Sequence, residues 1–363
     1  MSSSGLSVCA VLAITLLLTH SAAVVEQKYQ DKKCDLYSGR WVFDKSYPLY
    51  ASEKCPLILQ QFNCMRNGRP DLRYQKYRWQ PNNCNLPRWD WREIGNRLRG
   101  KRIMFVGDSL SMNQWQSLGC IIHAAYPRAP NYTPTTTGPL STIIFPQLNI
   151  TLMYMRNAFI VDLVAQNGVK VLKLNAVGAS AKQWLKTDFL IFNTWHWWLY
   201  NGRKKPWDLI QDGKLMRKDM DRLVAYEKAL RTWTRWIDQN VDTKKVKIFF
   251  QGVSPDHLLL YDSASDWGMP EQRRCGGERE PLKQAAVEEG GTNRADIILK
   301  GVLKSIKKPV YLLDIARLSQ YRADGHPSIY GNPRKIGMDC THWCLPGVPD
   351  AWNQLLFATL LGL

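Results

Sequence analysis

A serine at the end of an apolar run has the setting of a catalytic nucleophile. Ser109 follows Gly107 and Asp108, directly after the apolar run 101–106 and directly before a helical pattern. A short apolar run of this kind is typical of a buried parallel strand, and α/β proteins bind ligands at the carboxyl ends of such strands. The start of the helix adds free N–H groups and a partial positive charge, which can stabilise an oxyanion. We therefore predict that Ser109 is a nucleophile on a tight turn shaped by Gly107 and Asp108.

A base for this serine is offered by the run Asp339-Cys-Thr-His342 near the C-terminus. A serine hydroxyl attacks readily only when a base takes its proton, and a histidine is such a base when a carboxylate fixes its tautomer. Cys340 and Cys344 flank His342, so disulfides there would hold the base in place. The alternative is a surface loop pinned by cystines, in which the histidine is incidental. The presence of Ser109 in the same chain favours the catalytic interpretation.

Two further residues near these motifs could take part in proton transfer. His326 is an alternative base, but Gly325 and Pro327 beside it favour a turn and a structural role. Asp108 more often shapes a nucleophile turn than moves a proton. The sequence has no Gly-rich phosphate loop and no cluster of metal-ligand residues, so we expect no metal and no bound cofactor.

The N-terminal segment predicts entry into the secretory pathway. An apolar region at 6–18 precedes Ser21-x-Ala23, the small-residue pattern of a cleavage site. The region is shorter than the roughly 20 residues that span a membrane. Positive charges flank it only on the C-terminal side, which disfavours an anchor whose C-terminus lies in the lumen. We predict a signal peptide at 1–23, with an uncleaved anchor as the alternative, and membrane association only through this segment.

The cysteines and sequons fit the same compartment. Removal of the signal peptide leaves an even number of cysteines, and in a secreted chain such a set predicts four disulfides. They are Cys34, Cys55, Cys64, Cys84, Cys120, Cys275, Cys340 and Cys344. The sequons at Asn131 and Asn149 are candidate glycosylation sites.

The composition is basic and rich in tryptophan. The 363 residues include 49 Lys and Arg against 31 Asp and Glu, a formal charge of +18, which attracts polyanions. Because a secretory compartment argues against nucleic acid, a polymer carrying uronic acids is the expected partner. The 15 Trp residues either fill the core or grip flat ligands.

The elements that position these residues are predicted by hydrophobic patterning. Residues 26–90 form a loop-rich, disulfide-stapled segment that packs on the main domain, and an α/β pattern begins near Arg99. Strands are expected at 101–106, 143–145, 150–154, 159–164, 169–174, 188–192, 245–251 and 310–314. Helices are expected at 111–123, 219–240, 295–306 and 350–361. Alternating strands and helices predict a parallel sheet covered on both faces.

Several stretches together resemble a known family. They are Cys34–Val42, Arg78–Pro81, Arg102–Ser111, Phe192–Trp198, His326–Tyr330 and Asp339–Asp350. The early Gly-Asp-Ser and late Asp-x-x-His resemble the SGNH (GDSL-type) hydrolase superfamily. The full set is more similar to the plant trichome birefringence-like family of polysaccharide O-acetyltransferases. The resemblance implies a three-layer α/β/α sandwich at 87–363, preceded by a PMR5N-like cysteine-rich module at 33–86.

The resemblance also implies a site and a reaction. It implies a triad of Ser109, His342 and Asp339, and a double displacement in which Ser109 takes an acetyl group and a sugar hydroxyl removes it. Asn193 is the implied oxyanion donor, alongside the backbone N–H of Ser109. The superfamily's second-block glycine is missing at 155–158. The substrate-binding candidates are Arg156, Trp195, His196, Trp197 and Trp198. The implied disulfides are Cys34–Cys84, Cys55–Cys120, Cys64–Cys344 and Cys275–Cys340.

The substrates and the final acceptor stay open. The expected acceptor is a cell-wall polysaccharide, xylan or pectin, and the basic charge favours an acidic one. The acetyl donor is acetyl-CoA or an unidentified carrier. An acetylesterase with the same triad, in which water is the acceptor, is the first alternative. A non-catalytic wall-polysaccharide-binding protein is the second. The expected location is the Golgi lumen or membrane, or alternatively the cell wall.

Overall fold

The computed structural model describes residues 34–127, 134–178, 181–257, 275–283, 293–332 and 337–362. A seven-stranded sheet forms its centre. In order across the sheet, the strands are β13 (Tyr311–Leu313), β12 (Lys247–Gln251), β9 (Phe189–Phe192), β3 (Arg102–Gly107), β6 (Ile150–Arg156), β5 (Leu140–Phe145) and β4 (Thr135–Thr137). The strands from β13 to β6 are parallel, while β5 and β4 extend the edge as antiparallel strands.

The middle strand, β3, is buried because its residues are apolar on both faces. Residues 103–107 are all buried, and β3 pairs with β9 on one side and β6 on the other. In this register Val106 lies opposite Phe192, and Gly107 lies opposite Arg156. The carboxyl ends of three strands therefore meet at one edge, next to Ser109.

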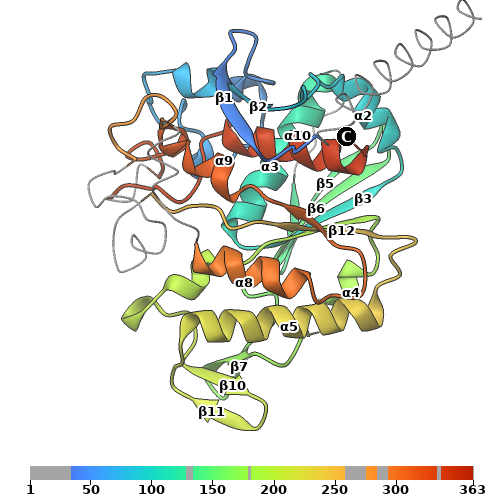
Figure 1. Cartoon of the computed structure of the whole chain (residues 1–363), viewed down its shortest axis with the longest axis vertical. Helices are drawn as coiled ribbons and strands as arrows, with labels where there is room; N and C mark the ends of the chain where they lie inside the picture. The colour runs from blue at the N-terminus through green and yellow to red at the C-terminus, as the bar shows by residue number, and fades with distance from the viewer. Residues whose placement is uncertain are drawn as a thin grey trace, which may run out of the picture.

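Helices cover both faces of the sheet, which confirms the predicted α/β/α architecture. The helices are α2 (Trp91–Arg97), α3 (Ser109–Ala125), α4 (Ala181–Trp184), α5 (Arg222–Asn240), α8 (Arg294–Leu303), α9 (Ala316–Gln320) and α10 (Val348–Leu360). Figure 1 shows α3 and α10 on one side of the sheet and α5 and α8 on the other. Each side has its own apolar core, one with Trp115 and Trp352, the other with Trp184 and Trp233.

The structure differs from the sequence prediction in a second, smaller sheet. Its strands, in order, are β11 (Leu215–Arg217), β10 (Leu209–Asp212), β8 (Val169–Lys173) and β7 (Asp162–Gln166). The strand predicted at 159–164 instead begins at Asp162, because Phe159, Ile160 and Val161 are buried in the core as irregular chain. Strands β10 and β11 were not predicted. This sheet lies beyond α5 at the foot of the molecule in Figure 1.

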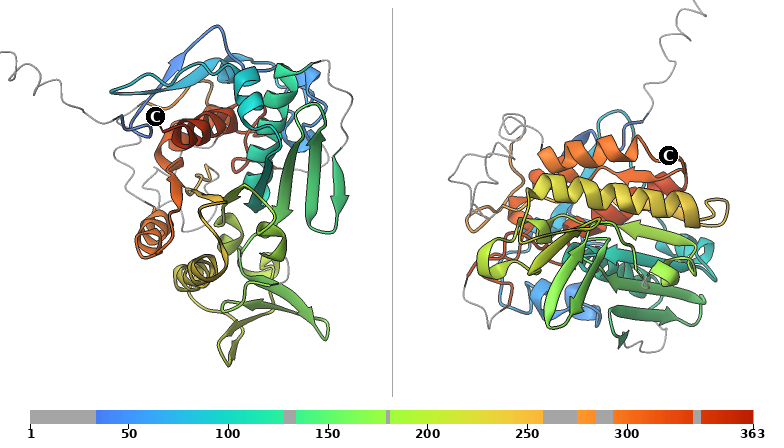
Figure 2. Two further views of the ribbon diagram at one scale, coloured as in Figure 1. Left: turned by 90° about the vertical axis from the view of Figure 1, so that its right-hand side faces the viewer. Right: turned by 90° about the horizontal axis from the view of Figure 1, so that it is seen from below.

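The N-terminal residues pack against the main domain, as predicted from their few apolar runs. They hold a hairpin of β1 (Gly39–Phe43) and β2 (Tyr77–Pro81), which the loop-rich interpretation missed. The Trp41 indole N–H donates to the carbonyl of Leu318 (2.7 Å), and the Tyr50 hydroxyl donates to the Asp350 carboxylate (2.9 Å). Figure 2 shows this segment, in blue, lying over α3 and α10.

The remaining short helices are 3-10 turns. They are η1 (Ser52–Lys54), η2 (Gln60–Phe62), η3 (Arg73–Lys76), η4 (His196–Leu199), η5 (Gly202–Lys204) and η6 (Ala323–Gly325).

The described residues contain four disulfides, with the pairing that the family resemblance implied. They are Cys34–Cys84, Cys55–Cys120, Cys64–Cys344 and Cys275–Cys340. Cys55–Cys120 and Cys64–Cys344 join the N-terminal segment to the main domain. Cys64–Cys344 and Cys275–Cys340 hold the loop on either side of His342.

The predicted signal peptide, residues 1–23, and the sequon at Asn131 lie outside the described residues. Within the ranges that the structure describes, none of the helices is long and apolar enough to cross a membrane. Asn149 is exposed and has a φ of 52° in the turn between β5 and β6, a conformation that asparagine tolerates well. Its glycosylation stays a prediction.

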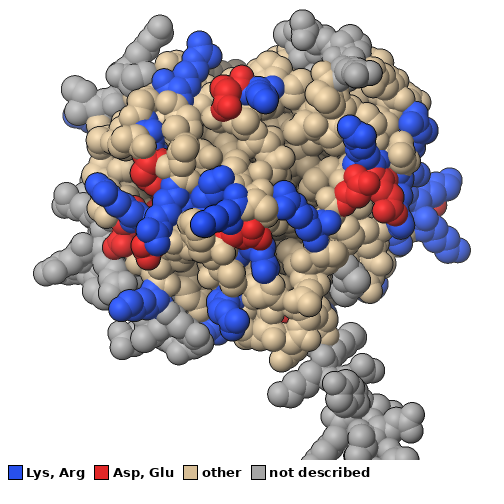
Figure 3. Space-filling view, turned by 90° about the horizontal axis from the view of Figure 1, so that it is seen from above, with Lys and Arg blue, Asp and Glu red and all other residues tan. Residues whose placement is uncertain are grey.

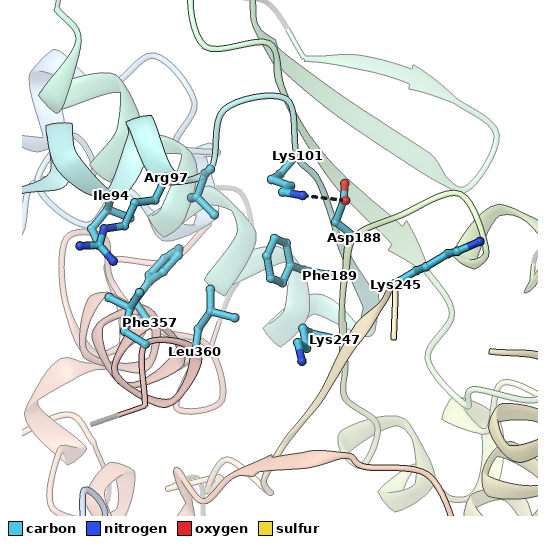
Figure 4. Close-up of a pocket in the computed structure, with 11 residues that line it drawn as sticks. Ile94, Arg97, Lys101, Asp188, Phe189, Lys245, Lys247, Phe357 and Leu360 are labelled. Carbon is cyan, nitrogen blue, oxygen red and sulfur yellow. Dashed lines mark hydrogen bonds and ion pairs between the residues drawn. The ribbon is translucent and has the colours of Figure 1, made fainter. Parts of the chain in front are cut away.

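A pocket opens at the opposite edge of the main sheet from Ser109 (Figure 4). Lys101 and Asp188, which precede β3 and β9, form an ion pair there (3.3 Å). Phe189 and Phe357 contribute apolar lining. Because these residues lie at the amino ends of the strands, this pocket does not belong to the site around Ser109.

Candidate active site

Ser109 is the first residue of α3, and Asp108 caps that helix. The Asp108 carboxylate accepts a hydrogen bond from the Leu110 N–H (2.9 Å), which satisfies one of the free N–H groups of the first turn. The helix starts two residues earlier than the sequence predicted because of this cap. Ser109 is half-buried at the carboxyl edge of the sheet, where its hydroxyl can meet a substrate.

Asn193 holds the turn from the neighbouring strand. Its side-chain oxygen accepts from the Asp108 backbone N–H (3.1 Å) and from the Ser111 hydroxyl (2.6 Å). Its amide nitrogen donates to the Asp108 carboxylate (2.9 Å). The amide therefore braces the nucleophile turn, and its implied role as an oxyanion donor stays a prediction.

Gly107 is required by this close approach. A Cβ atom at residue 107 would lie 1.8 Å from the side-chain oxygen of Asn193 and 2.6 Å from its carbonyl oxygen. We expect Gly107→Ala to lower the free energy of unfolding by about 1–3 kcal/mol, as overpacking does, and to lower acyl transfer sharply. Thermal unfolding and ester turnover check this prediction.

The matched control for that variant is Gly301→Ala, at an exposed position in the last turn of α8. No heavy atom lies within 4 Å of the Cβ that this change adds. Because alanine favours a helix over glycine, we expect Gly301→Ala to be neutral or stabilising. Equal stability and activity in the two variants would contradict the tight turn.

The structure brings Ser109, His342 and Asp339 into one chain of hydrogen bonds. His342 Nδ1 lies 2.8 Å from Asp339 Oδ2, and His342 Nε2 lies 2.7 Å from Ser109 Oγ. A carboxylate can only accept, so Nδ1 carries the proton and Nε2 is free to accept from the serine hydroxyl. This is the tautomer that a general base needs.

The charges of this pair stabilise each other. Burial opposes the charged form of His342, but the Asp339 carboxylate and its hydrogen bond raise the pKa of the imidazole above its ordinary value. Burial likewise opposes the charged carboxylate, but His342 and the N–H groups of residues 341 and 342 hold the pKa of Asp339 well below its ordinary range. Asp339 is therefore ionised whenever His342 is neutral.

The loop that carries His342 is fixed on several sides. Asn113, one turn along α3 from Ser109, accepts from the Trp343 N–H (2.8 Å) and donates to the Trp343 carbonyl (3.1 Å). The disulfide to Cys64 holds the loop at Cys344. Asn113 thus connects the helix that begins at Ser109 to the loop that carries His342. This residue was missed because one asparagine inside a helix gives no sequence signal.

Two of the predicted aromatic cleft residues are core residues. Trp195 and Trp198 are 4% and 0% exposed, and both contact Tyr226 of α5, at ring-centroid distances of 5.0 and 6.0 Å. They are too deeply buried to stack on a sugar, so this prediction is wrong. His196 is 9% exposed and donates from Nε2 to the Ser254 carbonyl (3.0 Å), which gives it a structural contact instead.

Arg156, Trp197 and Tyr200 contact one another near the carboxyl end of β6, where Arg156 pairs with Gly107; Arg156 and Tyr200 are exposed, and Trp197 is half-buried. The Arg156 guanidinium lies over the Trp197 ring, 5.5 Å from its centroid, and Tyr200 meets Trp197 edge-on at 5.4 Å. Burial raises the pKa of Tyr200, with smaller contributions from Asp256, Asp108 and Asp339. Tyr200 was not predicted, because a tyrosine after a 3-10 turn carries no signal of its own.

His326 does not act on Ser109 directly. It is 1% exposed, and its Nδ1 lies 2.6 Å from the backbone carbonyl of His342, behind the base. The structural role favoured by the sequence agrees with this position. Among the described residues, no group of three or more His, Cys, Asp or Glu side chains could hold a metal ion.

Comparison with known proteins defines the class to which this fold and site belong. Residues 86–359 match the GDSL/SGNH-like acyl-esterase family found in Pmr5 and Cas1p. Residues 32–85 match the PMR5 N-terminal domain.

Similar full-length relatives specify the family further. The chain is 49% identical over 330 residues to protein trichome birefringence-like 43 of Arabidopsis thaliana, covering 91% of this chain and 88% of the relative. It is 47% identical over 355 residues to trichome birefringence-like 41 of the same plant, covering 98% and 96%. The chain belongs to the trichome birefringence-like family. This membership and the four disulfides indicate the secretory pathway.

Proposed function

We propose that this protein transfers acetyl groups to hydroxyls of a plant cell-wall polysaccharide through an acyl-enzyme on Ser109. The observation that carries the proposal is the hydrogen-bonded chain from Ser109 through His342 to Asp339. It stands at the start of a helix in a domain of the acyl-esterase family.

The first half-reaction loads the serine. His342 Nε2 takes the Ser109 proton as Oγ attacks the acetyl carbonyl carbon, and the carbonyl oxygen becomes an oxyanion. The Ser109 backbone N–H, in the first turn of α3, and Asn193 are the proposed donors to that oxyanion. The tetrahedral intermediate then collapses. The bond from carbon to the donor group breaks, and the imidazolium returns its proton to the leaving group.

The second half-reaction unloads the serine. A sugar hydroxyl donates its proton to His342 Nε2 while its oxygen attacks the acyl carbon. The bond to Ser109 Oγ then breaks, and Ser109 takes back the proton. Asp339 stays ionised throughout and stabilises the imidazolium in both halves. The acetyl donor is acetyl-CoA or a carrier with an equally good leaving group.

The acceptor we propose is an acidic wall polysaccharide, either pectin or a xylan that carries uronic acids. Arg156 can pair with a carboxylate, and the half-buried ring of Trp197 and the exposed ring of Tyr200 can contact a pyranose. The net charge of +18 attracts a polyanion. Figure 3 shows Lys and Arg side chains spread widely over one face, with fewer Asp and Glu. We propose the Golgi lumen as the location, where such polymers could be acetylated before secretion.

An acetylesterase remains the second candidate, favoured by the description of the matched family as acyl-esterases. The two functions use the same acyl-enzyme and differ in the acceptor. Purified protein should be incubated with an acetyl donor and deacetylated xylan, homogalacturonan or mannan oligomers, followed by mass spectrometry. We expect an added acetyl mass on an acidic oligomer. Removal of acetyl from acetylated oligomers, with no transfer, would establish the esterase, and binding without turnover would overturn both.

The proposed acceptor makes Arg156 a specificity residue. We expect Arg156→Ala to raise the KM for acidic oligomers by about tenfold, since a charge-assisted hydrogen bond is lost. The KM for neutral mannan oligomers should stay unchanged. Arg97→Ala is the matched control, because Arg97 lies at the pocket on the opposite edge of the sheet. Equal losses on acidic and neutral oligomers would contradict recognition of a carboxylate.

A further inference from the structure

Two buried histidines lie side by side behind the base loop, which is the loop of residues 339–344 that carries His342. His257, after β12, and His326, after η6, are 3% and 1% exposed. His257 Nδ1 lies 2.6 Å from His326 Nε2. The backbone N–H of His257 also donates to the Cys340 carbonyl (3.0 Å), so both histidines contact the loop of His342.

The outer nitrogens of the pair each face a carbonyl oxygen. His326 Nδ1 lies 2.6 Å from the His342 carbonyl, and His257 Nε2 lies 3.1 Å from the Gln320 carbonyl. A carbonyl oxygen only accepts, so each of these nitrogens must carry a proton. Two neutral rings would then turn two lone pairs toward each other at 2.6 Å. One additional proton between the rings turns that contact into a hydrogen bond.

The number of protons on the two imidazole rings sets the charge of the pair. Three protons on four ring nitrogens make one imidazole and one imidazolium, a total of +1. The Trp343 ring is stacked on His326, with centroids 4.0 Å apart and planes at 23°, as a cation over an aromatic face would be. The two carbonyls add partial negative charge.

The other charged groups around the pair come from every neighbouring element. They are Asp339 and His342 on the base loop, Asp256 next to His257, Arg69, which donates to the His326 carbonyl, and the ion pair of Arg322 with Asp324. Burial lowers the pKa of each ring, that of His257 to about 4, because a buried cation loses its hydration. The hydrogen bond between the rings acts the other way, since it exists only when one ring is charged.

We propose that His257 and His326 share one proton and act as positioning residues for the base His342. The shared proton keeps Nδ1–H of His326 directed at the His342 carbonyl, and it places a positive charge behind the imidazole. That charge disfavours a second cation nearby, so it lowers the pH at which His342 loses its proton. The effect on rate rests on the proposed function of Ser109 and His342, whereas the shared proton does not.

The test uses the full purified chain and the acylation of Ser109 by p-nitrophenyl acetate, followed from pH 4 to 9. His257→Asn offers an amide N–H to His326 Nε2, so it removes the charge and keeps the contact. We expect its plateau rate to stay within about threefold of wild type. The acidic limb of its pH–rate profile should move to higher pH by about one unit, as expected for loss of a nearby charge at an effective dielectric of about 20.

A second pair of variants separates the contact from the charge. We expect His326→Leu to lower the plateau rate by about 100-fold, because a misplaced base loses alignment with Ser109. His326→Asn keeps an N–H near the His342 carbonyl and should recover most of that loss. His123→Asn is the control, since His123 lies near the far end of α3 and contacts the Lys54 carbonyl. An unshifted acidic limb in His257→Asn, or wild-type rates in His326→Leu, would overturn the proposal.

Proton NMR of 15N-histidine-labelled protein reports on the pair without any activity. We expect a low-field N–H resonance that is present in wild type and absent in His257→Asn. Its absence from wild type between pH 5 and 7 would refute the shared proton even if Ser109 is acylated. Conversely, its presence in a protein whose Ser109 is not acylated would refute the proposed function and leave the pair intact.

Discussion

Ser109→Ala is expected to lower acetyl transfer by at least about 10³-fold, the loss typical of removing a member of a serine triad. The variant has no Oγ to carry the acetyl group, so the double displacement has no first step. Its fold should be unchanged, because Ser109 is half-buried and its Oγ contacts His342 Nε2. Turnover of p-nitrophenyl acetate measures the rate. Mass spectrometry of the intact protein measures how much acyl-enzyme forms.

The matched control for Ser109→Ala is Ser305→Ala, at the end of α8. Its hydroxyl donates to the Val302 carbonyl (2.7 Å) and lies on the other side of the sheet from α3. We expect this control to keep full activity and to form the acyl adduct at Ser109. Full activity of Ser109→Ala itself, or an adduct on another residue, would refute the nucleophile assignment.

The inner strands of the central sheet were predictable because they are continuous apolar runs with a neighbouring strand on each side. Residues 101–106 and 188–192 were recognised in this way, and their neighbours in the sheet repeat the pattern. The edge strand β4, which consists of three exposed threonines, was not predicted. Strands β10 and β11 could not be recognised from apolar runs. Strand β11 is three exposed residues long, and β10 pairs with a strand more than thirty residues earlier. Their existence depends on that distant pairing rather than on local sequence.

The site likewise divides into residues with a local sequence signal and residues whose role depends on distant contacts. The turn at Ser109 and the base at His342 were predictable because each is a short local motif. Asn113 and His257 were not, because their roles depend on a loop that the fold brings to them from far along the chain. The prediction for Trp198 failed for a related reason: a tryptophan next to a strand end faces solvent or core according to what covers it, and here Tyr226 of α5 covers it.

The N-terminal segment helps to build the site as well as cover the domain. The Leu345 N–H donates to the Phe62 carbonyl (2.9 Å), and the Phe62 ring lies 5.4 Å from that of His342. Arg69 donates to the carbonyls of Asp324 and His326 (2.8 and 3.0 Å). Because these contacts and the disulfide from Cys64 all reach the segment between residues 324 and 345, the base depends on residues up to 280 positions earlier.

Asp339→Asn is expected to lower the rate of Ser109 acylation by about 10³ to 10⁴-fold with little change in KM, because the wrong histidine tautomer becomes favoured. An asparagine can turn its amide N–H toward His342 Nδ1, which then becomes the acceptor. The remaining proton moves to Nε2, and Nε2 can no longer take the proton of Ser109. Loss of the carboxylate also removes the charge that raises the pKa of His342, so the imidazolium becomes less stable.

Stability should respond to pH in a specific way. The pKa of Asp339 is depressed in the folded protein, so its ionised form stabilises the fold above the ordinary carboxyl range. That contribution is lost as pH falls through and below this range. The pKa of His342 is raised by the same pair, so its charged form adds stability that is fully present below the ordinary imidazole pKa of 6.5 and is lost as pH rises through the folded pKa. The difference in unfolding free energy between wild type and Asp339→Asn should therefore be largest between the ordinary carboxyl range and pH 6.5, and should shrink both toward pH 3 and toward alkaline pH.

Asp238→Asn provides the matched control for this variant. The Asp238 carboxylate accepts from the backbone N–H groups of Lys307 and Lys308 (3.1–3.3 Å), as Asp339 accepts from those of Thr341 and His342 (3.2 and 3.0 Å). Only Asp339 contacts a histidine as well. We expect Asp238→Asn to keep its acylation rate within about twofold, because an amide oxygen preserves contacts of this kind. An acylation rate of Asp339→Asn within tenfold of wild type would show that the carboxylate does not set the tautomer of His342.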